Sequence, residues 1–287
     1  MKNNVLLAGS LSLLIVTLFS CNNATTPSTE ALAAKQDSTP TRRDEQAVMA
    51  ILYQQKAAEY RALCFQAYNI ATQRVAYALS HPHKKPLAVI TDLDETALDN
   101  SAIAALEYLH DSATFPRLTS WWLQGIADSV PGSVSFFKYC AKNKVDIYYI
   151  SNRDASAPVI SATRRNMDSL GFPQCEEKDT SHFLFKTNKS SKQDRRDTVQ
   201  KYRDVIVYLG DNLADHDAAF DNPTKDSRRT AVDKLTSVWG SKYIVFPNAD
   251  YGDWENVLYN GFLSATQRQK DSMRRLALDT MKIHGHW

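Results

Sequence analysis

The sequence predicts an α/β protein with a Rossmann-like parallel sheet and helices on both faces of the sheet. Three observations predict this fold. Short apolar runs recur along the chain, helical patterns separate them, and polar residues follow directly after several of the runs. The strands of a parallel sheet are buried on both faces, so they are almost continuously apolar instead of alternating. The apolar runs that we expect to form strands cover residues 87–91, 145–150, 182–185, 205–209 and 243–246.

Residues 1–20 are expected to be a signal peptide. Lys2 precedes an apolar stretch, residues 5–19, that is too short for a stable membrane span. The stretch ends in Leu-Phe-Ser-Cys, which resembles a bacterial lipoprotein signal with Cys21 as the lipidated mature N-terminus. Asn22 would by family precedent permit export to the outer membrane, so we expect a lipoprotein of the bacterial cell envelope, periplasmic or surface-exposed. The alternative is an ordinary secretory signal in which Cys21 is coincidental.

Residues 21–43 are rich in Thr, Ser, Asn, Pro and Ala and are predicted to form a flexible tether. Residues 44–287 are long enough for one α/β domain with an insertion. The net charge is +2, and no basic tract is interleaved with aromatic residues, which argues against a nucleic-acid polymer as partner. The spacing of the other cysteines supports neither a disulfide framework nor a zinc site, although one disulfide is left open among Cys64, Cys140 and Cys175.

Three further segments are expected to be helical. Apolar residues recur at helical spacing from residue 44 to about residue 80, which predicts an N-terminal helical segment of one or two helices. Residues 264–283 form a second amphipathic pattern. The insertion at about residues 100–130 is predicted to be a helical, aromatic cap near the site, or else a local hydrophobic cluster. Its aromatic residues are Tyr108, Phe115, Trp121 and Trp122.

Polar residues suited to chemistry follow three of the predicted strands. In doubly wound sheets, ligands bind just beyond the carboxyl ends of the strands. Two neighbouring carboxylates repel unless a cation lies between them or one is protonated, and a hard divalent ion such as Mg²⁺ suits such oxygen ligands. A solvated turn would explain one acidic pair, but hardly the coincidence of three strand ends. The residues concerned are Asp92 and Asp94, then Ser151, Asn152 and Arg153, then Gly210, Asp211 and Asp215.

Lysines occur just before the helix that precedes the fourth strand. Ser190 or Ser191 would cap this helix and place Lys192 in its first turn. A cation is poorly tolerated at the positive end of a helix unless an anion lies nearby, so a phosphate is expected here. The spacing leaves both Lys189 and Lys192 open as its ligand, and we favour Lys192.

The order of these motifs resembles the haloacid dehalogenase superfamily. Residues 92–96 read Asp-x-Asp-x-Thr, a strand-end serine and a lysine follow, and residues 210–215 read Gly-Asp-x-x-x-Asp. Residues 92–101 and 210–215 resemble more narrowly the class C acid phosphatases, bacterial lipoproteins that include the outer-membrane acid phosphatase and 5′-nucleotidase group. The resemblance extends from about Tyr53 to Trp254. It implies a haloacid dehalogenase-like core and one Mg²⁺ ion in each active site.

The resemblance also implies a role for each motif residue. Asp92 would be the nucleophile that forms an aspartyl-phosphate, and Asp94 the general acid and then the base. Mg²⁺ would be held by the Asp92 carboxylate, the Asp94 main-chain carbonyl and Asp211, with Asp215 binding it directly or through water. The residues expected to bind the phosphoryl oxygens are Ser151, Asn152 and Lys192 or Lys189. An acid optimum is expected if Asp94 starts protonated, which a nearby carboxylate would help.

In relatives that prefer nucleotides, aromatic side chains from the insertion and from the final loop stack on the base. Trp121 and Tyr251 are the corresponding candidates for a substrate pocket here. An aromatic residue expected shortly before Trp121 is replaced near Leu118, so the preference for nucleotides is left open.

The sequence therefore predicts a metal-dependent acid phosphatase that hydrolyses phosphomonoesters, with nucleoside 5′-monophosphates among the candidate substrates. One alternative is a phosphotransferase that uses the same intermediate with an alcohol acceptor. Another is a ligand-binding surface lipoprotein without turnover. The expected partners are a small phosphomonoester, a membrane reached through the lipid anchor and, by resemblance only, a second copy of the chain in a homodimer.

Overall fold

The computed structural model describes residues 47–110, 118–175, 180–221, 224–259 and 264–278. The predicted signal peptide, the lipidation site at Cys21 and the tether lie outside the described residues, as does Phe115 of the insertion. No helix among the described residues combines the length and the apolar character that crossing a membrane requires.

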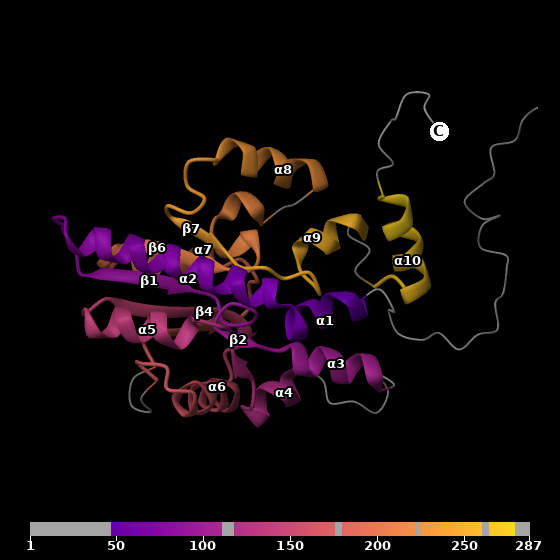
Figure 1. Cartoon of the computed structure of the whole chain (residues 1–287), viewed down its shortest axis with the longest axis horizontal. Helices are drawn as coiled ribbons and strands as arrows, with labels where there is room; N and C mark the ends of the chain where they lie inside the picture. Colours follow the sequence, from indigo (N-terminus) through magenta and orange to yellow (C-terminus); the bar gives the residue numbers. More distant parts are fainter. Residues whose placement is uncertain (1–46, 111–117, 176–179, 222–223, 260–263, 279–287) are drawn as a thin grey trace, which may run out of the picture. The chain divides into compact units, whose positions relative to one another are not determined.

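A five-stranded sheet with the strand order β5-β4-β1-β6-β7 forms the centre of the fold (Figure 1). Every pair of neighbouring strands is parallel, and all residues of β1 are buried, as expected for a central strand covered on both faces. The predicted α/β fold with a parallel sheet is confirmed. The strands are β1 (Leu87–Thr91), β4 (Asp146–Asp154), β5 (Phe183–Lys186), β6 (Asp204–Gly210) and β7 (Tyr243–Val245).

The strand order creates a crevice where the chemistry is expected. From β1 the chain adds β4 and β5 next to one edge of β1, and it then returns to add β6 and β7 next to the other edge of β1. The carboxyl ends of β4, β1 and β6 therefore lie next to one another at a point where the direction of winding reverses. Such switch points are where open α/β sheets bind ligands.

Alternate side chains of β1 enter two separate hydrophobic cores, as the two-residue period of a strand requires. Leu87 and Val89 belong to the larger core, which α2, α5 and α6 cover, whereas Ile90 belongs to a smaller core with Val199 of α7. Helices thus cover both faces of the sheet. Their bounds are α2 (Ala58–Leu79), α5 (Ser133–Lys142), α6 (Ala157–Ser169) and α7 (Gln193–Tyr202).

The N-terminal helical segment consists of two helices, α1 (Ala47–Lys56) and α2, which extended backbone at Ala57 separates. The insertion contains α3 (Ser101–Leu109) and α4 (Leu118–Gln124), so its described part is largely helical. Before and after these helices, β2 (Leu98–Asp99) pairs with β3 (Asp128–Ser129) in a short antiparallel ribbon. Helix α1 packs against α3, and α4 packs against α6.

Several element boundaries differ from the prediction. Strand β4 continues through Ser151, Asn152 and Arg153, because its pairing with β5 resumes at Asp154 after a register shift. Lys192 is the N-cap residue of α7 and does not lie in the first turn. Elements not predicted from the sequence are the short helices η2 (Leu213–Asp215), η3 (Ala218–Phe220), α9 (Asp253–Asn256) and η4 (Val257–Tyr259), and helix α8 (Lys225–Lys234).

Two other expectations concern the C-terminus and the cysteines. The C-terminal helix α10 (Gln267–Leu276) is shorter than the predicted span 264–283, whose last residues lie outside the described part. Cys64, Cys140 and Cys175 are all buried free thiols, so no disulfide joins these three cysteines.

Candidate active site

The chain turns sharply just after β1, and this turn separates Asp92 from Asp94. The Asp92 amide still donates to the Leu209 carbonyl of β6 at 2.9 Å, which continues the sheet pairing by one residue. The Leu93 carbonyl then accepts the amides of both Ala97 and Leu98 at 2.8 Å, which closes a tight loop. The two aspartates therefore do not lie along one continuing strand, and their side chains face different partners.

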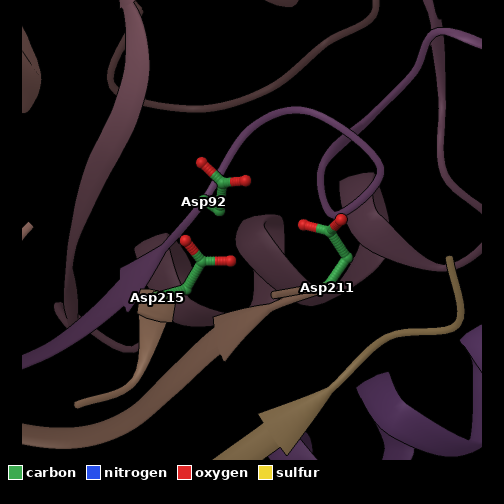
Figure 2. Close-up of side chains that lie close together, drawn as sticks. All are labelled: Asp92, Asp211 and Asp215. Atoms are coloured by element: carbon green, nitrogen blue, oxygen red, sulfur yellow. The ribbon is translucent and has the colours of Figure 1, made fainter. Parts of the chain in front are cut away.

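Asp92, Asp211 and Asp215 form a cluster in which the ligand oxygens all lie within 4.8 Å of one another. Figure 2 shows their carboxylates turned toward a common space. The end of β1 supplies Asp92, the residue after β6 is Asp211, and η2 supplies Asp215. Gly210 makes this approach feasible, because a Cβ atom there would lie 2.4 Å from the Asp215 Cβ.

Hydrogen bonds hold two of these carboxylates in place. The main-chain amide of Asn212 donates to Asp215 Oδ2 at 3.0 Å, and the side-chain Nδ2 of Asn248 donates to Asp211 Oδ2 at 2.8 Å. Asn248 follows β7, so the last strand of the sheet also contributes to the geometry of the cluster. The carboxyl ends of β1, β6 and β7 together build the acidic centre.

Burial and mutual repulsion make the cluster unfavourable as three free anions. Burial raises the pKa of Asp92 and raises that of Asp211 well above its usual value, and in both cases neighbouring carboxylates add to the effect. Lys192 is 5% exposed and offsets part of this charge, because its Nζ pairs with Asp92 and lies 2.7 Å from Asp215 Oδ1. One lysine cannot balance three carboxylates. A hard divalent cation with oxygen ligands fits the remaining negative charge.

Asp94 lies outside this cluster and is bound by Arg153. The Arg153 Nη2 atom lies 2.7 Å from Asp94 Oδ1, and its Nε atom lies 3.1 Å from both carboxylate oxygens. Asn100 Nδ2 donates to the same Oδ1 at 2.8 Å. Burial alone would raise the pKa of Asp94, but the charge and hydrogen bonds of Arg153 bring it below its usual value. A nearby carboxylate was expected to help keep Asp94 protonated, but in the structure Arg153 outweighs this effect.

The candidate phosphate ligands differ in their placement. The Ser151 hydroxyl is buried and lies 3.5 Å from Asp94 Oδ2, and Lys192 is part of the acidic cluster. Asn152 lines the pocket, with its Oδ1 accepting from Arg195 at 2.6 Å. The side chain of Lys189 is 70% exposed and pairs with Asp194 at 3.1 Å, so the structure does not bring it to the cluster. Of the two lysines, only Lys192 is in a position to contact a phosphoryl group there.

The cluster opens into a pocket of about 710 Å³. Tyr251 lines this pocket as predicted, and so do Leu118 and Trp122 of α4. Trp121 does not line it: its ring is buried in the larger core, and its Nε1 donates to Asn100 Oδ1 at 2.8 Å. The insertion therefore supplies both a pocket wall and part of the hydrophobic core, the two alternatives that the sequence left open.

Sequence reasoning missed Glu95, Asn100 and Asn248 as parts of the site. Glu95 and Asn100 lie close to the motif aspartates in the sequence, which was the available signal, whereas Asn248 lies 37 residues from Asp211. In the structure Arg153 pairs with Asp94.

Comparison with known proteins identifies the family. Residues 12–254 match the family described as HAD superfamily, subfamily IIIB (acid phosphatase). The chain belongs to this family. It is also similar to the solved structure of the class C acid phosphatase from Bacillus anthracis, with 35% sequence identity and a TM-score of 0.76 over 82% of this chain and 97% of that chain. The same values hold for a crystal structure of the Bacillus anthracis phosphatase with tungstate bound.

These matches confirm the resemblance that the motifs predicted. The subfamily IIIB assignment makes the protein a hydrolase of the acid phosphatase class. The buried cluster of Asp92, Asp211 and Asp215 is a candidate metal site within that family.

Proposed function

We propose that this acid phosphatase hydrolyses phosphomonoesters through an aspartyl-phosphate on Asp92, assisted by one Mg²⁺ ion. The observation that carries the proposal is the acidic cluster with Lys192 beside it, placed where three strands of the sheet end. A pure binding protein would need neither a second acid, Asp94, two residues from the first nor a cluster of three carboxylates, two buried and one partly buried, at one point.

The ion would be held by the carboxylates of Asp92, Asp211 and Asp215. The family resemblance adds the main-chain carbonyl of Asp94. When bound, the ion neutralises negative charge on the carboxylates and on the transferred phosphoryl group. Raised pKa values at Asp92 and Asp211 support this assignment, because their causes, burial and then the neighbouring carboxylates, are both offset when a cation binds the carboxylates.

Each side chain of the site has its own role in the proposed two-step reaction. An Asp92 oxygen attacks the phosphorus atom, the bond from phosphorus to the leaving oxygen breaks, and Asp94, which must start protonated, supplies the proton that the leaving oxygen takes up. Because Arg153 lowers the pKa of Asp94, this proton transfer requires acid pH. Water then attacks the phosphorus of the aspartyl-phosphate, Asp94 accepts a proton from it, and inorganic phosphate leaves as the Asp92 carboxylate reforms. Lys192 and Ser151 would bind the phosphoryl oxygens during both steps. Tungstate is a tetrahedral oxyanion like phosphate, so its presence in the similar Bacillus anthracis structure supports an oxyanion site.

The test is hydrolysis of p-nitrophenyl phosphate with and without Mg²⁺. Wild type should turn over only with the ion, and Asp92→Asn should lose activity about a thousandfold or more, as expected when a nucleophile is removed. Asp146→Asn is a matched control, because Asp146 begins β4 at the opposite end of the sheet and pairs with Arg203. Phosphate-analogue binding without turnover in wild type would instead identify a binding protein.

The same assay distinguishes a phosphatase from a phosphotransferase. With an added alcohol, a phosphatase releases inorganic phosphate in step with p-nitrophenol, whereas a phosphotransferase yields a new phosphoester and less phosphate. Nucleoside 5′-monophosphates as substrates, the lipid anchor at Cys21, a cell-envelope location and a homodimer are also part of the proposal. They are supported by the sequence resemblance alone.

A further inference from the structure

Glu95 is a buried acid next to the catalytic motif that the proposed mechanism does not use. Glu95 is 1% exposed. Polar groups buried this fully need hydrogen-bond partners, because burial without them is costly. Its backbone has a φ of 58°, in the left-handed region that residues other than glycine seldom adopt. Such a conformation persists only where the surrounding structure holds it, and it occurs frequently at functional sites.

Protein donors occupy both carboxylate oxygens of Glu95. The main-chain amide of Asn100 donates to Oε1 at 2.8 Å, and Gln54 Nε2 of α1 lies 3.4 Å from the same oxygen. The Tyr251 hydroxyl donates to Oε2, and Asn100 Nδ2 lies 3.3 Å from it. With its oxygens engaged in this way, Glu95 can act on the reaction through the residues it holds.

Tyr251 is the partner of Glu95 that reaches the substrate pocket. It lies 156 residues further along the chain, in the loop after β7, and it is 44% exposed and lines the pocket. A half-exposed tyrosine would ordinarily donate to water. Here the hydroxyl is bound instead to a buried carboxylate, so the ring is fixed at one end while part of it faces the pocket.

The loop that carries Tyr251 is attached to the catalytic centre at a second point. Asn248 Nδ2 donates to Asp211, and Asn248 Oδ1 accepts the amides of Asp250 at 2.9 Å and Tyr251 at 3.3 Å. One end of the loop is thus bonded to the acidic cluster and the other to the residue beside Asp94. These two attachments set the position of the pocket wall relative to the reacting atoms.

We propose that Glu95 is a positioning residue that holds the Tyr251 ring in place in the pocket wall, and so strengthens binding of those substrates whose leaving group lies against that ring. The inference rests on the proposed phosphatase activity. A flat group can lie against the fixed ring, whereas a small aliphatic leaving group gains little from it. Glu95 therefore acts on substrate selection and leaves the chemical steps to Asp92 and Asp94.

The test compares flat and small substrates in three variants. Tyr251→Phe keeps the ring and removes the hydroxyl, and Glu95→Gln keeps the shape of the side chain but replaces one carboxyl oxygen with an amide nitrogen that cannot accept from the Tyr251 hydroxyl. Tyr251→Phe should raise KM for p-nitrophenyl phosphate and AMP about fivefold, the scale of one lost hydrogen bond. Its kcat should stay within about twofold, and KM for glycerol phosphate should be unchanged. Glu95→Gln should shift the same values in the same direction, but less.

The double variant decides whether Glu95 acts through Tyr251. Without the Tyr251 hydroxyl, the hydrogen bond between residues 95 and 251 cannot form in any variant. The double variant Glu95→Gln/Tyr251→Phe should therefore have the same KM for flat substrates as Tyr251→Phe alone. If Glu95→Gln raises KM for the flat substrates as much in the Tyr251→Phe variant as it does in wild type, Glu95 acts on another group and the proposal is overturned. Glycerol phosphate hydrolysis in each variant shows that the acidic cluster is intact.

Tyr243→Phe is the matched control, because the Tyr243 hydroxyl donates to the Asp217 carboxylate at 2.9 Å and does not line this pocket. It should leave the ratio of flat to small substrates unchanged. Wild type without Mg²⁺-dependent hydrolysis of any phosphomonoester would refute the phosphatase proposal itself. If wild type is active and Tyr251→Phe has the same ratio of activity on flat and small substrates as wild type, only the role of Glu95 is refuted.

Discussion

Two buried cations give the two motif aspartates different surroundings. Lys192 pairs with Asp92 and Asp215 of the acidic cluster, whereas Arg153 pairs with Asp94. Consequently the pKa of Asp92 is raised by burial and by neighbouring carboxylates, while that of Asp94 falls below its usual value. A cation in the cluster would favour the ionised, nucleophilic form of Asp92. Pairs of acids whose environments move their pKa values apart are typical of sites in which each acid has its own role.

Arg153→Lys should therefore impair the chemical step more than substrate binding. The guanidinium binds both oxygens of Asp94 and also donates to Thr163 Oγ1 at 2.9 Å, which a lysine ammonium cannot reproduce. We expect kcat to fall about 10- to 100-fold with KM little changed, as for a lost contact to a reacting group. Steady-state kinetics measures both constants. A loss carried mainly by KM would show that Arg153 contacts the substrate instead.

Arg203→Lys is the control for this substitution. Arg203 follows α7 and pairs with Asp146 at the start of β4, away from the carboxyl ends of the strands. Its side chain and that of Asp146 are both partly exposed, so the pair should contribute little. Activity close to that of wild type is expected.

At the level of elements, apolar runs predicted the five strands, while several contacts that complete the site could not be predicted. Trp121 and Trp122 are adjacent on α4, so they face directions about 100° apart. A helix of 7 residues is too short for its pattern to show which of the two is buried. At α7, Ser191 Oγ accepts the backbone amide of Gln193 at 3.3 Å, as expected of a serine at a helix start, and its hydroxyl also donates to Asp221 at 2.6 Å, a partner 30 residues away that the sequence does not indicate.

The sequence also could not decide that Asp94 pairs with Arg153 or that Glu95 pairs with Tyr251. The partners in these pairs are 59 and 156 residues apart, and local patterns carry no information about such contacts. Motif spacing did indicate that Asp92, Asp211 and Asp215 converge, because the ends of parallel strands share one edge of a sheet. What it could not show was how two cations divide the charge of these acids.

Gly210→Ala tests how closely the end of β6 approaches η2. An added Cβ would lie 2.4 Å from Asp215 Cβ and 2.5 Å from its Oδ2, so Asp215 would have to move out of the cluster. We expect the affinity for Mg²⁺ to fall about tenfold or more, as when a metal ligand is displaced. Isothermal titration with Mg²⁺ measures this affinity.

Gly240→Ala controls for general destabilisation. Gly240 has a φ of 74°, which strains alanine, yet within the described part of the chain no atom other than those of its chain neighbours lies within 4 Å of the added Cβ. This variant should lower the melting temperature without weakening Mg²⁺ binding. Equal Mg²⁺ affinity in wild type and Gly210→Ala would mean that Asp215 is not needed to bind the ion.

For the molecule as a whole, the acidic cluster links metal binding to the stability of the fold. Asp92 extends β1, Asp211 follows β6, and Asn248 beyond β7 is bonded to Asp211, so three strands of one sheet meet at this point. Without a cation, repulsion among the carboxylates acts directly on the carboxyl ends of these strands. A ligand that binds only the folded state stabilises it in proportion to the logarithm of its concentration over Kd.

Mg²⁺ should therefore raise the melting temperature of the whole domain. At 100 times Kd the gain is about 2.7 kcal/mol, which corresponds to a shift of about 5–10 °C for a chain of this size. Asp211→Asn should melt higher than wild type in EDTA, because one repelling carboxylate is gone, and should respond to Mg²⁺ much less. Asp194→Asn removes an exposed acid that pairs with Lys189 and should respond like wild type. Differential scanning calorimetry distinguishes these outcomes, and an unchanged Mg²⁺ response in Asp211→Asn would place the ion elsewhere.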